Sequence, residues 1–310
     1  MPKFAFVFPG QGSQAVGMLN GFADNAIVRQ TVSEASDALD FDLGKLIAEG
    51  PKEDLDLTTN TQPVMLTAAV AYYRAWNAAG GSAPSVVAGH SLGEYSALVA
   101  SGVIAFQDAV RLVRFRAKAM QEAVPVGQGG MAAILGLSDE DVIAACAEAA
   151  QGEVVEPANF NAPSQLVIAG HKAAVARACE AAKAKGAKRA LVLAVSAPFH
   201  SSLLKPASDR LREYMAGLTF SSPQIPLINN VDVEILSDPE AIKDALVRQA
   251  ASPVRWVETI RKVASMDVTH VIECGPGKVL AGLSRRIEGS LTGDAIFDQA
   301  SLDNMLEALK

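Results

Sequence analysis

The sequence is poor in the residues that characterise several large protein classes. Its 310 residues include three cysteines, four histidines and 5% aromatic residues. Cys146, Cys179 and Cys274 are far apart and form no C-x-x-C pair, which predicts reduced thiols in a cytoplasmic protein rather than a disulfide framework. Neither H-x-x-x-H nor H-E-x-x-H occurs, so we expect no metal site.

Long apolar runs and an excess of basic charge are also missing. No window approaches the run of about 20 apolar residues that spans a bilayer, and the apolar run at residues 4–8 is too short for a signal peptide. The formal net charge is -7, from 27 basic and 34 acidic residues, which argues against a general nucleic-acid binder. We therefore expect neither a membrane nor a nucleic-acid partner.

The apolar residues that are present follow an alternating pattern. Half of the chain is apolar, and at roughly 150 residues per domain its length suits two domains. Short apolar runs at residues 3–8 and 85–89 alternate with helical patterns, among them a long helix expected to begin at Thr61 with Pro63 in its first turn. This alternation predicts an α/β fold with a mainly parallel sheet.

A middle segment differs from the rest of the chain. It opens with a stretch rich in glycine and proline, and the order that follows is strand, helix, strand, strand, helix, strand, which is the ferredoxin-like order. Its strands are expected at residues 131–137, 154–160, 165–170 and 189–195. We predict a ferredoxin-like small domain at residues 125–196, inserted into a discontinuous hydrolase-like large domain made of residues 1–124 and 197–310.

Residues 89–93, with the sequence GHSLG, match the motif G-x-S-x-G. A short apolar strand is predicted before them and a helix after them, and a nucleophile elbow requires that context. The glycines let the chain turn tightly, and the N–H groups that open the helix can stabilise an oxyanion. We therefore predict that Ser91 is a nucleophile, against the alternative of a glycine-rich turn with a capping serine.

A serine nucleophile needs a base, and the four histidines differ in position. His90 directly precedes the serine, His171 lies at a helix start, and His270 begins an apolar strand. His200 lies in a loop just past a strand, where catalytic groups usually sit, so we choose it as the base. No acid between Ser91 and His200 plainly follows a strand of the large domain, so an amide or a backbone carbonyl is expected to orient the histidine.

Two further features have competing interpretations. Residues 10–15, GQGSQA, fit the dinucleotide motif G-x-G-x-x-[GA] after a strand, but the acid expected about 20 residues later would lie in a helical, polar stretch. Alternatively, backbone N–H groups of this loop supply a second oxyanion donor that faces the elbow. Arg116 lies on the helix after the elbow, where a solvated basic face is the ordinary interpretation of an arginine.

Taken together, these residues resemble the malonyl-CoA:acyl carrier protein transacylase family. The resemblance covers essentially the whole chain and is far more specific than G-x-S-x-G alone. The architecture of that family, a hydrolase-like large domain with a ferredoxin-like insert, agrees with the element order above. The matching positions are residues 8–14, 89–94, 116, 199–200, 246–249 and 275–277.

The resemblance implies roles for the matching residues. Ser91 is the nucleophile that becomes malonylated, and His200 takes its proton and later activates the pantetheine thiol of the carrier protein. The N–H groups of Gln11 and Leu92 form the oxyanion hole. The main-chain carbonyl of Gln249 orients His200, which would explain the missing acid.

The implied reaction is a ping-pong transfer of malonyl from malonyl-CoA to acyl carrier protein for fatty-acid synthesis. Arg116 pairs with the free carboxylate of malonate, because a planar guanidinium binds a carboxylate in a bidentate manner. An acetyl group would leave this arginine unpaired and should load poorly. We expect no cofactor, since malonyl-CoA is a substrate, and a monomeric enzyme. The alternatives are a serine thioesterase or hydrolase acting on acyl-CoA, and a non-catalytic module that binds the carrier protein.

Overall fold

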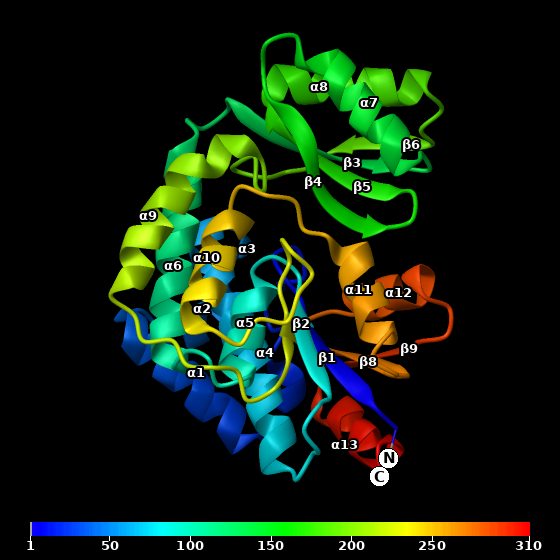
Figure 1. The fold of residues 1–310 in the computed structure, drawn as a ribbon. Helices are drawn as coiled ribbons and strands as arrows, with labels where there is room; N and C mark the ends of the chain where they lie inside the picture. The colour runs from blue at the N-terminus through cyan, green and yellow to red at the C-terminus, as the bar shows by residue number, and fades with distance from the viewer. Residues whose placement is uncertain (1) are drawn as a thin grey trace.

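A computed structural model describes residues 2–310, and its strands form two separate sheets (Figure 1). The first sheet is parallel, with the strand order β7-β2-β1-β8-β9. Its strands are β1 (Phe4–Phe8), β2 (Val86–Gly89), β7 (Leu227–Ile228), β8 (His270–Cys274) and β9 (Thr292–Ile296). The chain passes from β1 to β2 and β7 on one side, and later to β8 and β9 on the other side. In such sheets ligands bind at the carboxyl ends of the strands, where the strand order reverses.

Helices cover both faces of the parallel sheet, so its strands are apolar throughout. Phe4, Phe6 and Phe8 of β1 face one core, and Ala5 and Val7 face the other. The first core is covered by α1 (Ala26–Leu39), α2 (Leu43–Glu49), α3 (Lys52–Leu55), α4 (Thr58–Ala78), α5 (Gly93–Ala100), α6 (Phe106–Ala123), α9 (Lys205–Ala216), α10 (Pro239–Gln249) and α13 (Gln299–Ala308). The second core is covered by α11 (Trp256–Ala264) and α12 (Val279–Ile287). Short 3-10 helices occur at Asn20–Phe22 and Ser202–Leu204.

The second sheet is antiparallel, with the strand order β4-β5-β3-β6. It consists of β3 (Gly129–Leu135), β4 (Val155–Ala162), β5 (Gln165–His171) and β6 (Arg189–Val192), with α7 (Asp139–Ala150) and α8 (Lys172–Ala184) packed on one face. The helices lie on the side away from the parallel sheet (Figure 1). This is the ferredoxin-like arrangement, so the predicted fold class is confirmed.

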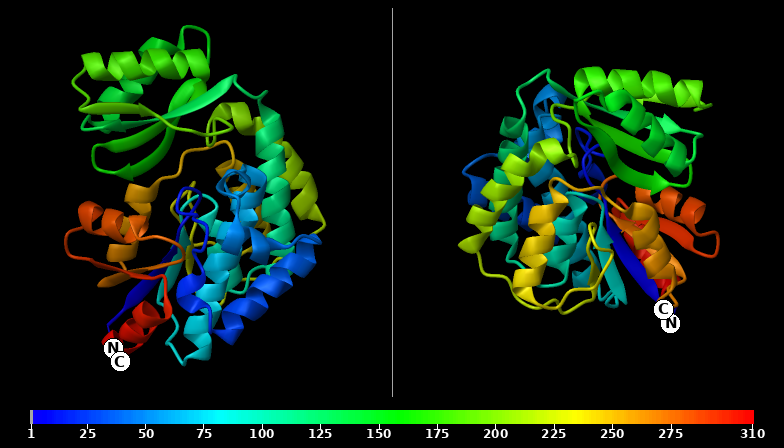
Figure 2. Two further views of the ribbon diagram at one scale, coloured as in Figure 1. Left: turned by 180° about the vertical axis from the view of Figure 1, so that it is seen from behind. Right: turned by 45° about the horizontal axis from the view of Figure 1, so that its top comes forward.

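The antiparallel sheet contacts the segment before α11 and the loop that precedes residue 200, next to the site described below. Val254 donates its N–H to Ala158 O at 2.9 Å, and Phe160 donates to Val254 O at 3.0 Å, which extends the edge of β4. Phe199 packs on the open face of the antiparallel sheet. The start of β1 and the end of α13 lie together at the opposite end of the molecule (Figure 2).

One predicted helix boundary is wrong. Helix α4 begins at Thr58 rather than at Thr61, and Pro63 lies inside the helix. Thr61 does not cap the helix, because its hydroxyl instead donates to Leu55 O at 2.6 Å. Burial along α4 therefore outweighs the hydrogen bond that a proline inside a helix removes.

None of the helices within residues 2–310 combines the length and the apolar character needed to cross a membrane.

Candidate active site

Ser91 lies in a sharp turn between β2 and α5. Its φ is 53°, in the left-handed region that a side chain seldom adopts, as expected for a nucleophile elbow. The flanking glycines are required by packing. A Cβ on Gly89 would lie 1.9 Å from the carbonyl carbon of Gly93, and a Cβ on Gly93 would lie 2.0 Å from Phe8 O. The turn therefore needs both glycines of the motif.

His200 lies next to the serine hydroxyl. The distance from Ser91 Oγ to His200 Nε2 is 2.6 Å, and His200 Nδ1 lies 2.9 Å from the main-chain oxygen of Gln249. A carbonyl oxygen only accepts, so Nδ1 carries the proton and Nε2 is free to accept the serine proton. The carbonyl thus occupies the place of the acid in a Ser-His-Asp triad.

The electrostatic environment keeps His200 neutral. Its side chain is buried, and burial, followed by the charge of Arg116, lowers the pKa of His200 to about 3. At neutral pH the imidazole is therefore a free base. Proton transfer from the serine would create a cation next to the Gln249 carbonyl, which would stabilise it.

The loop that carries His200 is held from both sides. His200 itself has a φ of 62°. Ser201 Oγ donates to Pro198 O at 2.7 Å. The N–H and the hydroxyl of Ser202 donate to the two carboxylate oxygens of Glu156 on β4, each at 2.8 Å. The antiparallel sheet therefore helps to position the base.

Arg116 projects from α6 into the same site and is 1% exposed. Its two terminal nitrogens donate to Gln62 Oε1 and Gln249 Oε1, both at 2.9 Å, and one of them lies 3.4 Å from Ser91 Oγ. Within residues 2–310 no carboxylate forms an ion pair with this guanidinium. The guanidinium also lies over the ring of Tyr95, at 5.3 Å from its centroid. A buried cation whose hydrogen bonds go only to neutral oxygens is suited to an anionic ligand, so the interpretation of Arg116 as a solvated surface residue is wrong.

The N–H groups of Gln11 and Leu92 lie at the carboxyl ends of two paired strands. Gln11 follows β1, Leu92 follows β2, and the two strands end in register at Phe8 and Gly89. Among residues 2–310 neither N–H donates to a protein acceptor. Both groups are therefore available to an oxyanion.

The dinucleotide interpretation of residues 10–15 is not supported by the fold. In that motif the glycine loop opens directly into a helix whose N-terminus holds the pyrophosphate. Here, within residues 2–310, turns follow β1, and the first helical residues are at Asn20–Phe22. The loop instead packs against the elbow, where a Cβ on Gly10 would lie 2.7 Å from His90 O.

The other three histidines do not reach the serine hydroxyl. His90 Nε2 lies 2.7 Å from Asn161 Oδ1, and its ring packs edge-on against Trp256. His171 Nδ1 accepts from Val154 N at 2.9 Å, in the antiparallel sheet. His270 Nδ1 lies 2.8 Å from the hydroxyl of the adjacent threonine. The selection of His200 from its loop position therefore agrees with the geometry.

Three site residues were missed by sequence reasoning. Asn230 accepts from Ser91 N at 2.8 Å and donates to Gly89 O at 2.7 Å, so it holds the elbow. Gln62 contacts both Arg116 and the side chain of Gln11. Glu94 accepts from Gln249 Nε2 at 2.9 Å. Glu94 is the last residue of the matching segment 89–94, although no role was predicted for it. Asn230 could have been noticed because it lies two residues past the end of β7, whereas the position of Gln62 on a helix carries no such signal.

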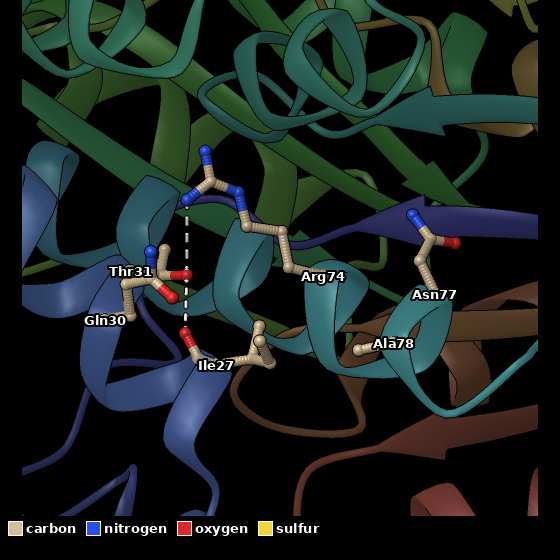
Figure 3. A pocket seen from close by; sticks show the side chains of 6 residues that line it. All are labelled: Ile27, Gln30, Thr31, Arg74, Asn77 and Ala78. Atoms are coloured by element: carbon tan, nitrogen blue, oxygen red, sulfur yellow. Dashed lines mark hydrogen bonds between the residues drawn. The ribbon is translucent and has the colours of Figure 1, made fainter.

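A cavity of about 270 Å³ lies elsewhere, between α1 and α4 (Figure 3). Arg74 Nη1 donates to Thr31 Oγ1 at 3.3 Å across it, and also to Glu34 at 2.6 Å. Its lining residues are Ile27, Gln30, Thr31, Arg74, Asn77 and Ala78, and none of them belongs to the serine–histidine site.

The parallel sheet and the serine–histidine pair define an enzyme that acts through a serine nucleophile. The family described as Acyl transferase domain matches residues 5–287 and places the chain in the acyltransferase class. Proteins named malonyl CoA-acyl carrier protein transacylase from Salmonella typhimurium and Escherichia coli K12 are each 56% identical to the chain; each match covers 99% of this chain, and 99% and 100% of the respective relative. The chain therefore belongs to the malonyl CoA-acyl carrier protein transacylase family, which confirms the resemblance found in the sequence.

Solved structures agree with this assignment. An acyl-carrier-protein S-malonyltransferase from Burkholderia pseudomallei is 70% identical, covers 98% of this chain and 99% of its own, and has a TM-score of 0.97. A malonyl-transacylase in complex with its type II PKS acyl-carrier protein is 54% identical, with 99% of each chain covered and a TM-score of 0.98.

Proposed function

We propose that this enzyme transfers the malonyl group of malonyl-CoA to the phosphopantetheine thiol of acyl carrier protein, through a malonyl-Ser91 intermediate, and so supplies fatty-acid synthesis. The observation that carries this proposal is the hydrogen-bonded series from Ser91 Oγ through His200 to the Gln249 carbonyl, with the buried Arg116 beside the hydroxyl. The series provides a nucleophile and its base, and Arg116 provides a site for the second carboxylate of malonate.

In the first half-reaction, the Ser91 hydroxyl attacks the thioester carbonyl while His200 Nε2 takes its proton. The N–H groups of Gln11 and Leu92 hold the oxyanion of the tetrahedral intermediate. The C–S bond then breaks, and the proton passes from His200 to the departing sulfur, so CoA leaves as a thiol. In the second half-reaction His200 deprotonates the carrier thiol, which attacks the ester, and the proton returns to Ser91.

The nucleophile, the base and the oxyanion donors are sufficient for both half-reactions. Acyl exchange between a thioester and a serine needs only a nucleophile, a base and oxyanion donors, so we propose that the enzyme uses no cofactor.

We propose a large domain at residues 1–124 and 197–310 and a small domain at 125–196. The three cysteines are free and buried, which supports a reducing, cytoplasmic location.

The reaction class is tested by mixing the enzyme with malonyl-CoA alone and measuring its intact mass. A transferase is expected to accumulate a malonyl adduct, which disappears when holo-acyl carrier protein is added and reappears on the carrier. A thioesterase would instead release malonate steadily and show no adduct, and that result would contradict the proposal.

Substrate selectivity tests the proposed role of Arg116. We expect Arg116→Ala to lower the ratio of kcat/KM for malonyl-CoA to that for acetyl-CoA by about 100-fold, because the malonyl carboxylate loses its partner in a buried site. Arg114→Ala is the matched control, since Arg114 lies on the same helix but bonds Asn60 Oδ1 at 3.1 Å. An unchanged ratio in Arg116→Ala would rule out this role.

A further inference from the structure

The side-chain amide of Gln249 has three polar contacts and is fully buried. Its nitrogen donates to Ser91 O and to Glu94 Oε2, each at 2.9 Å. Its oxygen accepts from Arg116 at 2.9 Å. A reversed amide would direct its oxygen at two acceptors and its nitrogen at a donor, so the contacts permit one orientation only.

Glu94 is one of the three groups that impose this orientation, together with Ser91 O and Arg116. It lies in the first turn of α5, three residues after the nucleophile, and is 1% exposed. The oxygen that accepts from Gln249 also accepts from Asn230 N at 3.1 Å. Burial raises the pKa of Glu94 to about 7, while these hydrogen bonds and the charge of Arg116 oppose the rise. Burial of this carboxyl costs free energy of desolvation, which its hydrogen bonds to Gln249 and Asn230 offset only in part.

The neutral amide lies between the buried acid and the buried arginine. A carboxylate in direct contact with Arg116 would form a charge-assisted bond about twice as strong as a neutral one and would compete with an incoming carboxylate. Gln249 avoids this competition, because it bonds Glu94 through its nitrogen and offers only an amide oxygen to the guanidinium. Arg116 is thus aimed without being neutralised by direct contact.

We propose that Glu94 is a positioning residue for substrate selection: it fixes the Gln249 amide, and through that amide it aims the Arg116 guanidinium at the malonyl carboxylate. This inference rests on the proposed function of Arg116. Without Glu94 the amide nitrogen keeps only Ser91 O as an acceptor, so the amide is held less firmly in this orientation. A rotated or reversed amide would no longer present its oxygen to the guanidinium. The loss would therefore fall on malonyl transfer more than on acetyl transfer.

The test uses the ratio of kcat/KM for malonyl-CoA to that for acetyl-CoA, measured with holo-acyl carrier protein. Glu94→Leu removes the acceptor and is expected to lower the ratio about tenfold, mainly through KM for malonyl-CoA, as for the loss of one bond to a charged group. Glu94→Gln keeps an oxygen that can accept from Gln249 and Asn230, so the ratio should stay within about twofold of the wild type. A purely structural role for Glu94 would lower both activities together and leave the ratio unchanged.

A double-mutant cycle identifies the route of the effect. Gln249→Leu retains the main-chain carbonyl that His200 uses, and is also expected to lower the ratio about tenfold. If Glu94 acts through Gln249, the malonyl-to-acetyl ratio of kcat/KM should fall about tenfold in the double variant, as in each single variant. A fall of about 100-fold would mean that the two residues act independently and would overturn the inference. Should Glu94→Leu fail to fold, Glu94→Ala replaces it in the same cycle.

Arg116→Ala, measured in parallel, separates two kinds of failure. If it leaves the ratio unchanged, the proposed role of Arg116 is wrong and this inference fails with it. If it lowers the ratio while the foldable Glu94 variant does not, the proposed function stands and the inference about Glu94 alone is overturned.

Discussion

Replacing Ser91 with alanine is expected to abolish both the malonyl adduct and transfer to the carrier protein, with a loss in kcat of about 10⁶-fold. The reason is that every step of the proposed route passes through Ser91 Oγ, which lies 2.6 Å from His200 Nε2. Ser91 carries the one side-chain hydroxyl of residues 89–93, and the backbone of this turn holds it at a φ of 53°. The measurements are intact mass after incubation with malonyl-CoA and the steady-state rate of malonyl transfer.

Ser96→Ala is the matched control for that experiment. Ser96 lies on α5, is also fully buried, and its hydroxyl has no hydrogen-bond partner within residues 2–310. Its removal should therefore leave the adduct and the rate close to those of the wild type. A malonyl adduct that persists in Ser91→Ala would show that another residue is acylated, and the proposed mechanism would fail.

The second large effect is expected from His200→Ala, at about 10³-fold in kcat, within the range for loss of a general base. His200 is a free base because burial holds its pKa at about 3, and its orientation comes from the carbonyl of Gln249 at 2.9 Å. In the proposed route both half-reactions need the base, since it activates first the serine and then the carrier thiol. Adduct formation and adduct discharge should therefore both slow when followed separately by rapid quench.

His270→Ala provides the control for the loss of a histidine. His270 begins β8. Within residues 2–310 its ring forms one hydrogen bond, to the hydroxyl of the adjacent threonine. We expect His270→Ala to form and discharge the malonyl adduct at wild-type rates. If His200→Ala slowed only adduct discharge and left adduct formation unchanged, some other group would be the base for Ser91.

Local sequence patterns were sufficient for the parts of the site that depend on one turn. The elbow could be predicted because its glycines, its serine and the flanking strand and helix are contiguous. His200 could be selected because it follows a strand in a loop. The ferredoxin-like order could be predicted in the same way, from apolar runs and helix-end residues that are each local in the sequence.

The strand β9 shows where such patterns fail. Its sequence, TGDAI, has no strong apolar run, and its residues are mostly half-buried. It is a strand because it pairs with the edge of β8 from His270↔Thr292 to Cys274↔Ile296. Hydrogen-bonding groups at a sheet edge can thus impose a strand that local composition does not indicate.

The sequence by itself determined the chemistry that this protein offers: a serine in an elbow, a histidine in a loop and an α/β framework, because each depends on residues close together in the chain. The tertiary structure decided what surrounds that chemistry. Gln62 on α4, Glu94 on α5, Arg116 on α6 and Gln249 on α10 meet only when these helices pack on the sheet. Packing buries Arg116 and surrounds its guanidinium with amide oxygens in place of water. The carboxylate-binding role that we propose for it therefore depends on distant segments rather than on its own helix.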